Sequence, residues 1–138
     1  MKTCFLSIDV ELLGAHSDKI SVRDDGTDPV KKFERITDVF KRHGAKATLF
    51  VTGEILEHYP DMVKKWALED FEIGCHNYYH VPLDKTDILG REKQLKDFVE
   101  IYKNALNNNP KGFRAPRNII DSEQFSILER YGFKIFKF

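Results

Sequence analysis

Short apolar runs and longer amphipathic stretches alternate along the chain. Each apolar run is bounded by polar or turn-forming residues, which is the pattern of a strand buried in a parallel sheet. The sequence predicts five such strands: Thr3–Asp9, Ala47–Val51, Phe71–Cys75, Gly112–Arg114 and Phe133–Phe138.

Two helices are predicted before the third strand. Thr27-Asp28 followed by Pro29 favours a helix start, and His43-Gly44 favours a helix end. Pro60 opens the second helix in the same way. The residues expected to face the core are Phe33, Ile36 and Phe40, flanked by Val30 and Val39, in the first helix, and Met62, Val63, Trp66 and Ala67 in the second.

Two more helices are predicted in the second half of the chain. One extends from about Ile88 to Leu106 and is capped by Thr86 or Asp87. The other is capped by Asp121 or Ser122 and ends at Gly132. The residues expected to face inward are Leu95, Phe98, Val99 and Tyr102 in the first of these, and Phe125, Leu128 and Tyr131 in the second.

Strands and helices therefore alternate strictly. Strands joined by helices pair in parallel through right-handed crossovers, and the helices cover the outside of the sheet. The length of 138 residues fits one domain that buries its own core. We therefore predict a single α/β domain built on a parallel sheet.

The composition is that of an ordinary globular protein, with 41% hydrophobic and 32% charged residues. The 22 basic residues balance the 22 acidic ones, which argues against a nucleic-acid partner. No apolar run approaches the ~20 residues of a membrane span. Asp9 interrupts the N-terminal apolar stretch too early for a signal peptide, so a cytoplasmic location is expected.

The two cysteines, Cys4 and Cys75, lie in strand-like apolar runs and form no CxxC pair. Two buried, reduced thiols are therefore predicted. Cys75 adjoins His76 and could be a metal ligand, but successive residues of a strand point to opposite faces. The sequence thus favours a buried thiol at Cys75.

Ionisable side chains gather where the predicted strands end. Asp9 and Glu11 share one side of their strand because the side-chain period is two. His76 and His80 converge if the backbone makes one helical turn between them, and Arg114 ends the fourth strand. Carboxyl ends of parallel strands meet at one edge, so these residues are expected to form one site. The alternative for each is an ordinary solvated side chain in a loop.

These segments resemble the motifs of the polysaccharide deacetylases, the NodB-homology domain of carbohydrate esterase family 4. Ser7-Ile8-Asp9-Val10-Glu11 resembles the acidic first motif, His76-Asn77-Tyr78-Tyr79-His80 the His-Ser/Thr-x-x-His second motif, and Arg114-Ala115-Pro116-Arg117 the Arg-x-Pro third motif. Residues 46–53 and 71–76 also resemble the second and third strands of the family, so the resemblance covers nearly the whole chain.

The resemblance implies a metal-dependent hydrolase that removes an N-acyl group, such as acetyl, from an amino sugar or polysaccharide. Glu11, His76 and His80 would hold a divalent metal, expected to be zinc, for which two imidazoles and one carboxylate leave an open position. Asp9 would be the general base that activates the attacking water. Arg114 would pair with Asp9 and hold it.

Several positions depart from the commoner family pattern. The acidic motif is Asp-x-Glu instead of two adjacent aspartates, and Asn77 replaces the usual Ser or Thr. Arg117 stands where many members carry an aromatic residue. Pro116 and Arg117 are the expected substrate contacts. His16, in the long first loop, is a weak candidate for the general acid.

The family's fourth and fifth motifs, which include the histidine general acid, have no counterpart in this sequence. The expected fold is therefore a partial, distorted β/α barrel of about five parallel strands with helices outside, in one domain over residues 1–138. The fifth strand would present an apolar edge, which predicts homo-oligomerisation or aggregation through it.

Two other functions remain open from the sequence. The chain could be a catalytically incomplete half-barrel that binds a metal or a carbohydrate without turning it over. It could also be a purely structural α/β domain whose site-like residues coincide by chance. Turnover separates the first alternative from an enzyme, and metal affinity separates the second from both.

Overall fold

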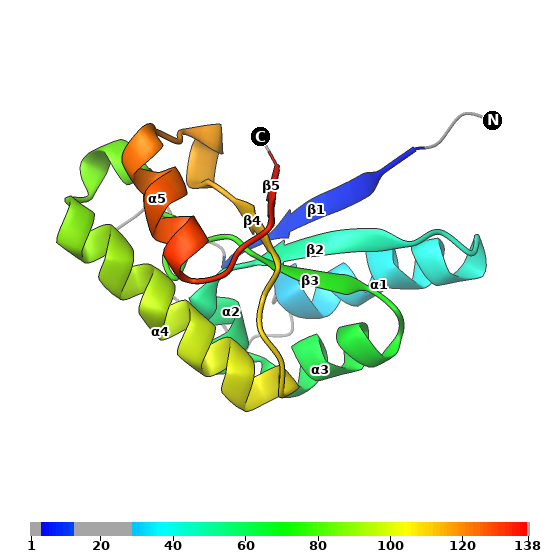
Figure 1. The fold of residues 1–138 in the computed structure, drawn as a ribbon. Helices are drawn as coiled ribbons and strands as arrows, with labels where there is room; N and C mark the ends of the chain where they lie inside the picture. The colour runs from blue at the N-terminus through cyan, green and yellow to red at the C-terminus, as the bar shows by residue number, and fades with distance from the viewer. Residues whose placement is uncertain (1–3, 13–28, 138) are drawn as a thin grey trace.

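The computed structural model describes residues 4–12 and 29–137. Its strands form a single sheet in the order β1-β2-β3-β4-β5, and every neighbouring pair is parallel. β1 and β5 are therefore the two edges of the sheet (Figure 1). The strands are β1 (Leu6–Val10), β2 (Ala47–Val51), β3 (Glu72–Cys75), β4 (Gly112–Arg114) and β5 (Ile135–Lys137).

The helices follow the strands as predicted, with one addition. The short helix α2 was not predicted, because its six residues are too few to show a helical apolar period. Asp87 and Asp121 cap α4 and α5 by accepting hydrogen bonds from the backbone N–H groups of Gly90 (2.7 Å) and Gln124 (2.9 Å). The helices are α1 (Pro29–Arg42), α2 (Gly53–His58), α3 (Pro60–Leu68), α4 (Ile88–Leu106) and α5 (Ser122–Arg130), with 3₁₀ turns η1 (Leu83–Lys85) and η2 (Pro116–Asn118).

Parallel strands in sequential order, joined by helices, make the pattern of a β/α barrel, and the described strands form part of one. A contact between strands that are not neighbours shows that the sheet curls. The Arg114 guanidinium of β4 lies 2.6 Å from the Asp9 carboxylate of β1. Strands that far apart in a flat sheet would be separated by ~14 Å, which is more than these two side chains span.

The inner face of the sheet is organised around Phe50. A Cβ atom at Gly74, in the next strand, would lie 2.6 Å from the Phe50 ring, so only glycine leaves room for this aromatic side chain. The Arg114 guanidinium lies over the same ring, 4.4 Å from its centroid. Phe50 thus fills the inside of the curl and supports the arginine above it.

The hydrophobic core lies between the outer face of the sheet and the helices. Leu49 of β2, Trp66 of α3 and Phe98 of α4 are fully buried there. The inward-facing residues predicted for α4, namely Leu95, Phe98, Val99 and Tyr102, are all buried as expected. Each buried side chain of this size stabilises the fold by roughly 1.5–3 kcal/mol.

Helix α1 packs partly as predicted: Phe33 is buried, and Phe40 is partly buried and packs against the core. Phe33 contacts Trp66, with the ring centroids 5.3 Å apart, and Thr37 is buried beside it. The prediction that Ile36 faces the core is wrong, because Ile36 is 42% exposed, and Val39, which was predicted to flank the stripe, is exposed to the same extent. Phe33 and Thr37 are four positions apart and lie on the face of α1 that meets α3. Ile36 and Val39 lie beside that face.

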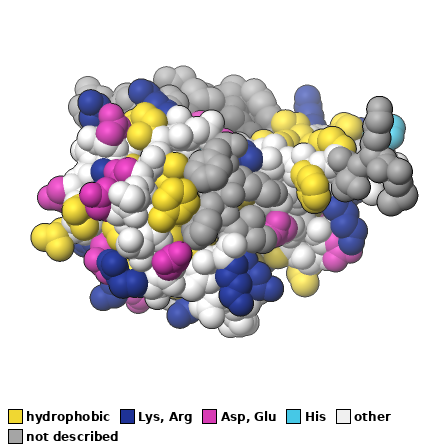
Figure 2. Space-filling model, turned by 45° about the horizontal axis from the view of Figure 1, so that its top comes forward, with side chains coloured by type: hydrophobic (Ala, Val, Ile, Leu, Met, Phe, Trp, Pro, Cys, Tyr) yellow, Lys and Arg dark blue, Asp and Glu magenta, His cyan; other side chains and the backbone are white. Residues whose placement is uncertain are grey.

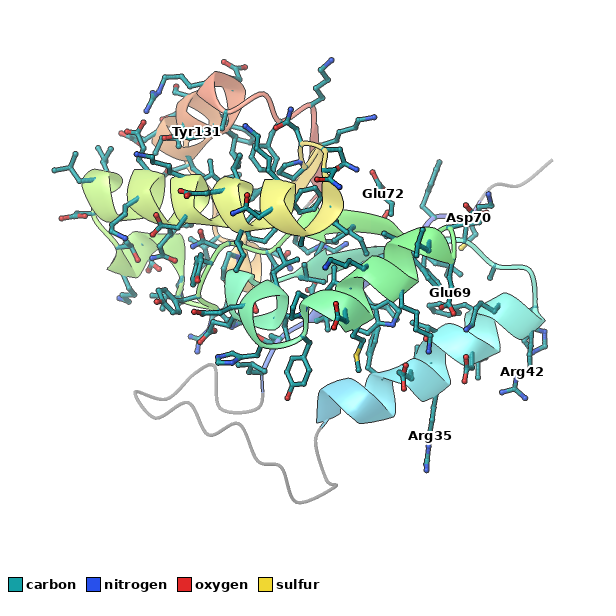
Figure 3. The ribbon with its side chains drawn as sticks, turned by 90° about the horizontal axis from the view of Figure 1, so that it is seen from below. Arg35, Arg42, Glu69, Asp70, Glu72 and Tyr131 are labelled. Atoms are coloured by element: carbon teal, nitrogen blue, oxygen red, sulfur yellow. The ribbon has the colours of Figure 1, made fainter. Side chains whose placement is uncertain are left out.

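Ion pairs reinforce the contact between α1 and α3. Lys41 of α1 lies 2.9 Å from Glu69, which directly follows α3, and Lys65 of α3 lies 2.7 Å from Glu34 of α1. Figure 3 shows the two helices side by side, with Glu69 between them and Arg35 pointing away from the chain. These pairs are partly exposed and contribute little to stability individually.

Three further predictions are corrected at the first strand, at Cys4 and in the last helix. β1 was expected to be buried, but it is an edge strand, and Leu6 is 37% exposed. Cys4, which precedes it, is exposed for the same reason. In α5 the fully buried residues include Gln124 and Ile127, whereas Phe125 and Tyr131 are only half-buried.

The face shown in Figure 2 has no large patch of charges of one sign. Acidic and basic side chains are interspersed there with scattered hydrophobic ones. Within residues 4–12 and 29–137, no helix has the length and apolar character needed to cross a membrane.

Candidate metal centre

The site lies where β1, β3 and β4 end. Asp9 belongs to β1, and Glu11 follows the strand by one residue. His76 directly follows β3, and its backbone N–H donates to the Val51 carbonyl (2.8 Å), which extends the pairing of β2 and β3 by one residue. The parallel sheet thus brings these side chains to one edge, as the sequence predicted.

Glu11, His76 and His80 form the one group in the described ranges that could hold a metal ion. One ligand atom from each residue lies within 4.8 Å of the others. His80 Nδ1 is 3.0 Å from a Glu11 carboxylate oxygen, and the two imidazole centroids are 4.9 Å apart. Two imidazoles and one carboxylate are the donor set of many catalytic zinc sites. The three predicted ligands therefore converge, and the set fits a divalent metal.

His76 is held in one tautomer. Its Nδ1 lies 2.8 Å from the Arg114 carbonyl oxygen, so Nδ1–H donates and Nε2 is left with its lone pair toward the site. Burial lowers the pKa of His76, against the opposing effects of Asp9, the Arg114 carbonyl and Glu11. The ring is therefore neutral near pH 7, which is the form that binds a metal.

Asp9 and Arg114 form the second part of the site. One Arg114 nitrogen donates to the Asp9 carboxylate (2.6 Å), and another donates to the Ser7 hydroxyl (2.6 Å). The second Asp9 oxygen lies 3.9 Å from His76 Nε2, so the carboxylate faces the candidate metal ligands. The arginine, fixed from below by Phe50, thus orients this carboxylate toward the candidate metal position.

The segment between the two histidines is fixed by helix α2, a relation that the sequence did not reveal. The Gly53 N–H donates to the Asn77 carbonyl (3.0 Å), and the Glu54 N–H donates to the Tyr78 carbonyl (3.3 Å). The Tyr78 ring lies directly on Gly53, where a Cβ would come within 2.5 Å of it. The first turn of α2 therefore acts as the support of the ligand-bearing segment.

Asn77 occupies a left-handed backbone conformation, with φ of 66°. Asparagine adopts this conformation more readily than most residues, and β-branched residues adopt it poorly. The conformation gives a physical reason for asparagine in place of the Ser or Thr that the family pattern favours.

We predict that Asn77→Thr lowers the free energy of unfolding by roughly 1–2 kcal/mol, whereas Asn77→Gly costs less because glycine accepts positive φ. Urea unfolding of the metal-free chain measures both. Each variant removes the buried amide of Asn77, so their difference reports the backbone. Equal stability of the two variants would contradict this explanation.

The two predicted substrate contacts, Pro116 and Arg117, lie just after β4. Pro116 is buried in η2, and Arg117 is exposed beside it with φ of 56°. Cys75 is fully buried and burial raises its pKa, so it is the protonated thiol that was predicted, outside the ligand group. His16 and the predicted helix cap at Thr27-Asp28 lie outside the described residues.

Comparison with known proteins agrees with this geometry. The family model for polysaccharide deacetylase matches residues 21–136. A peptidoglycan-N-acetylglucosamine deacetylase of Bacillus cereus is 34% identical over 112 residues, which are 81% of this chain and 40% of that protein. The chain thus spans about two fifths of the length of the first curated relatives it matches.

Solved structures share the fold. A CE4 family pseudoenzyme from Bacillus anthracis superimposes with a TM-score of 0.77 at 20% identity, covering 96% of this chain and 41% of its own. A family 4 carbohydrate esterase from Streptomyces lividans in complex with acetate gives a TM-score of 0.75 at 17% identity, covering 95% and 59%. The family match over most of the sequence, together with this fold, shows that the chain belongs to the polysaccharide deacetylase family.

Proposed function

We propose that this chain carries out the metal-dependent hydrolysis of an N-acetyl group on an amino sugar. The observation that carries the proposal is the convergence of Glu11, His76 and His80 within 4.8 Å of one another, beside an aspartate that an arginine holds in place. The Bacillus cereus relative acts, by its name, on N-acetylglucosamine of peptidoglycan. A sugar of this class is therefore the proposed substrate.

Each residue of the site has a role in this reaction. Glu11, His76 and His80 hold the metal, for which zinc is the proposed identity given the imidazole and carboxylate donors. When bound, such a metal supplies Lewis acidity to the amide carbonyl and lowers the pKa of a coordinated water. Asp9 accepts the proton of the attacking water, and Arg114 keeps the Asp9 carboxylate aimed at it.

Substrate contacts are proposed at the turn after β4. The buried ring of Pro116 fixes the backbone, and exposed Arg117 lies next to it, three residues after Arg114. A guanidinium at this place offers hydrogen-bond donors to the hydroxyl or anionic groups of a sugar. Self-association through the edge of β5 also stays a prediction; among the described residues, β5 pairs only with β4.

The test is acetate release from oligomers of N-acetylglucosamine. We expect release with added zinc, loss of release with a chelator, and recovery when zinc is restored. Metal binding by calorimetry is measured on the same samples. Metal binding without turnover on any N-acetylated amino sugar would instead identify a binding subunit, and the absence of both would exclude the proposed function.

A further inference from the structure

Arg91, the fourth residue of α4, carries a buried charge that the proposed reaction does not use. The residue is only 8% exposed, which is rare for an arginine. Its Nε donates to the backbone carbonyls of Leu83 and Thr86, both at 2.9 Å, and a terminal nitrogen donates to the Asp121 carboxylate (2.6 Å). A buried charge is costly unless it is paired and hydrogen-bonded, and this guanidinium has both kinds of partner.

The two carbonyl partners belong to the segment that follows the candidate ligand His80. Leu83 comes three residues after His80 and is fully buried, and it begins the turn η1, which Thr86 caps. The same helix also holds the residue before His80, because Oε1 of Gln94 accepts the backbone N–H of Tyr79 (3.3 Å). Side chains of α4 therefore hold the backbone on both sides of His80.

The carboxylate partner belongs to the segment that follows the proposed substrate contacts. Asp121 comes four residues after Arg117, and its other oxygen caps α5 by accepting the Gln124 N–H (2.9 Å). The backbone of Arg117 and of Asn118 is left-handed, each with φ of 56°. Such a conformation costs free energy for most residues and persists where the surrounding structure holds it. The side chains of Arg114 and Asp121 hold the two ends of this turn.

We propose that Arg91 is a positioning residue that joins these two segments, so that His80 and the turn at Arg117 keep a fixed relation to one another. The inference rests on the proposed function, which assigns metal binding to one segment and substrate binding to the other. The role requires the planar fork of a guanidinium, in which one nitrogen serves the carbonyls and another serves the carboxylate. Arg91 takes no part in the chemical step.

Two variants separate the two contacts of Arg91. Arg91→Met keeps an apolar stem and removes every donor. We expect its zinc affinity, measured by competition with a chromophoric chelator, to fall about tenfold, and its kcat/KM for oligomers of N-acetylglucosamine to fall about 10–100-fold. Asp121→Ser can still cap α5 but is too short to reach Arg91. We expect this variant to show a raised KM with an unchanged zinc affinity.

Two control variants test whether a general loss of packing or stability explains these effects. Glu92 is the next residue along α4 and pairs with Arg130, the last residue of α5 (3.0 Å), so Glu92→Ala weakens the contact of the same two helices. Tyr102→Phe removes another donor from α4 to a backbone carbonyl, that of Ile73 (3.1 Å). Both controls should keep the zinc affinity and KM of the wild type, even where their unfolding midpoints fall as far as that of Arg91→Met.

Amide hydrogen exchange of the metal-free chain gives a readout that does not depend on zinc. In Arg91→Met, residues 81–86 and 118–124 should both exchange faster than in the wild type. Wild-type affinity and KM in Arg91→Met, or equal losses in Glu92→Ala, would overturn the inference. A wild-type chain that neither binds zinc nor releases acetate would defeat the proposed function. Amide exchange would then still decide whether Arg91 joins the two segments, and unchanged exchange in Arg91→Met would overturn that as well.

Discussion

The His76→Ala, His80→Ala double variant should bind no zinc and release acetate only at background level. The two imidazoles supply two of the three ligand atoms that lie within 4.8 Å of one another, and Glu11 alone cannot hold the ion. Calorimetry should show a stoichiometry that falls from about one zinc per chain to zero, and the acetate assay should follow it.

The control for this result is the His43→Ala, His58→Ala double variant. Both histidines are exposed, one after α1 and the other at the end of α2, and neither belongs to the ligand group. This control removes the same number of histidines as the first variant, but the chain should still bind the metal. Zinc binding that survived in the first variant and not in the control would place the metal elsewhere.

Asp9→Asn should lower kcat about 10²–10⁴-fold, as expected for the loss of a general base, while zinc affinity stays within a few-fold of the wild type. The amide oxygen of asparagine can still accept the hydrogen bond from Arg114, so the geometry of the arginine is retained. What is lost is the capacity to accept a proton. The measurement is steady-state acetate release at saturating zinc, with zinc affinity determined separately.

Ser7→Ala is the matched variant for Asp9→Asn. Ser7 is on the same strand and also accepts a hydrogen bond from Arg114 (2.6 Å), but its hydroxyl is no base at neutral pH. We expect a kcat within about tenfold of the wild type, because only the support of Arg114 is weakened. If Asp9→Asn and Ser7→Ala reduced kcat equally, Asp9 would be a structural partner of the arginine and not the base.

These experiments address a site whose two parts depend on the curl of the sheet. The candidate metal ligands follow the ends of β1 and β3, whereas the arginine that pairs with Asp9 comes from β4. The Arg114 carbonyl accepts a hydrogen bond from His76, and the Arg114 guanidinium donates one to Asp9. One residue therefore couples the orientation of the candidate ligand His76 to that of the proposed base Asp9.

Much of this arrangement follows from local sequence pattern. The bounds of α4 agree with the prediction because Asp87 is a strong cap and apolar residues recur at helical spacing until Asn107 ends the helix. The bounds of β4 agree with the prediction as well. The grouping of Asp9, Glu11 and His76 at one sheet edge follows from the alternation of strands and helices, which forces parallel pairing. The motifs themselves predicted the group of Glu11, His76 and His80 that the structure brings together.

What the tertiary structure alone decided concerns contacts between segments distant in the sequence. The exposure of Ile36 and Cys4 depends on which face of α1 meets α3 and on the edge position of β1, and no local period contains that information. The Asp9–Arg114 pair joins residues 105 positions apart and exists only because the sheet curls.

The support of the segment between His76 and His80 by α2 likewise depends on the tertiary structure. A six-residue helix carries no periodic signal. From the sequence alone its Glu54 is expected to be solvated, whereas the structure shows it buried. Side-chain type and spacing are properties of the chain, so the sequence by itself determined the candidate ligands, the strands and their order. Burial, tautomer and pairing are properties of neighbours in space, and only the packed sheet and helices determined them.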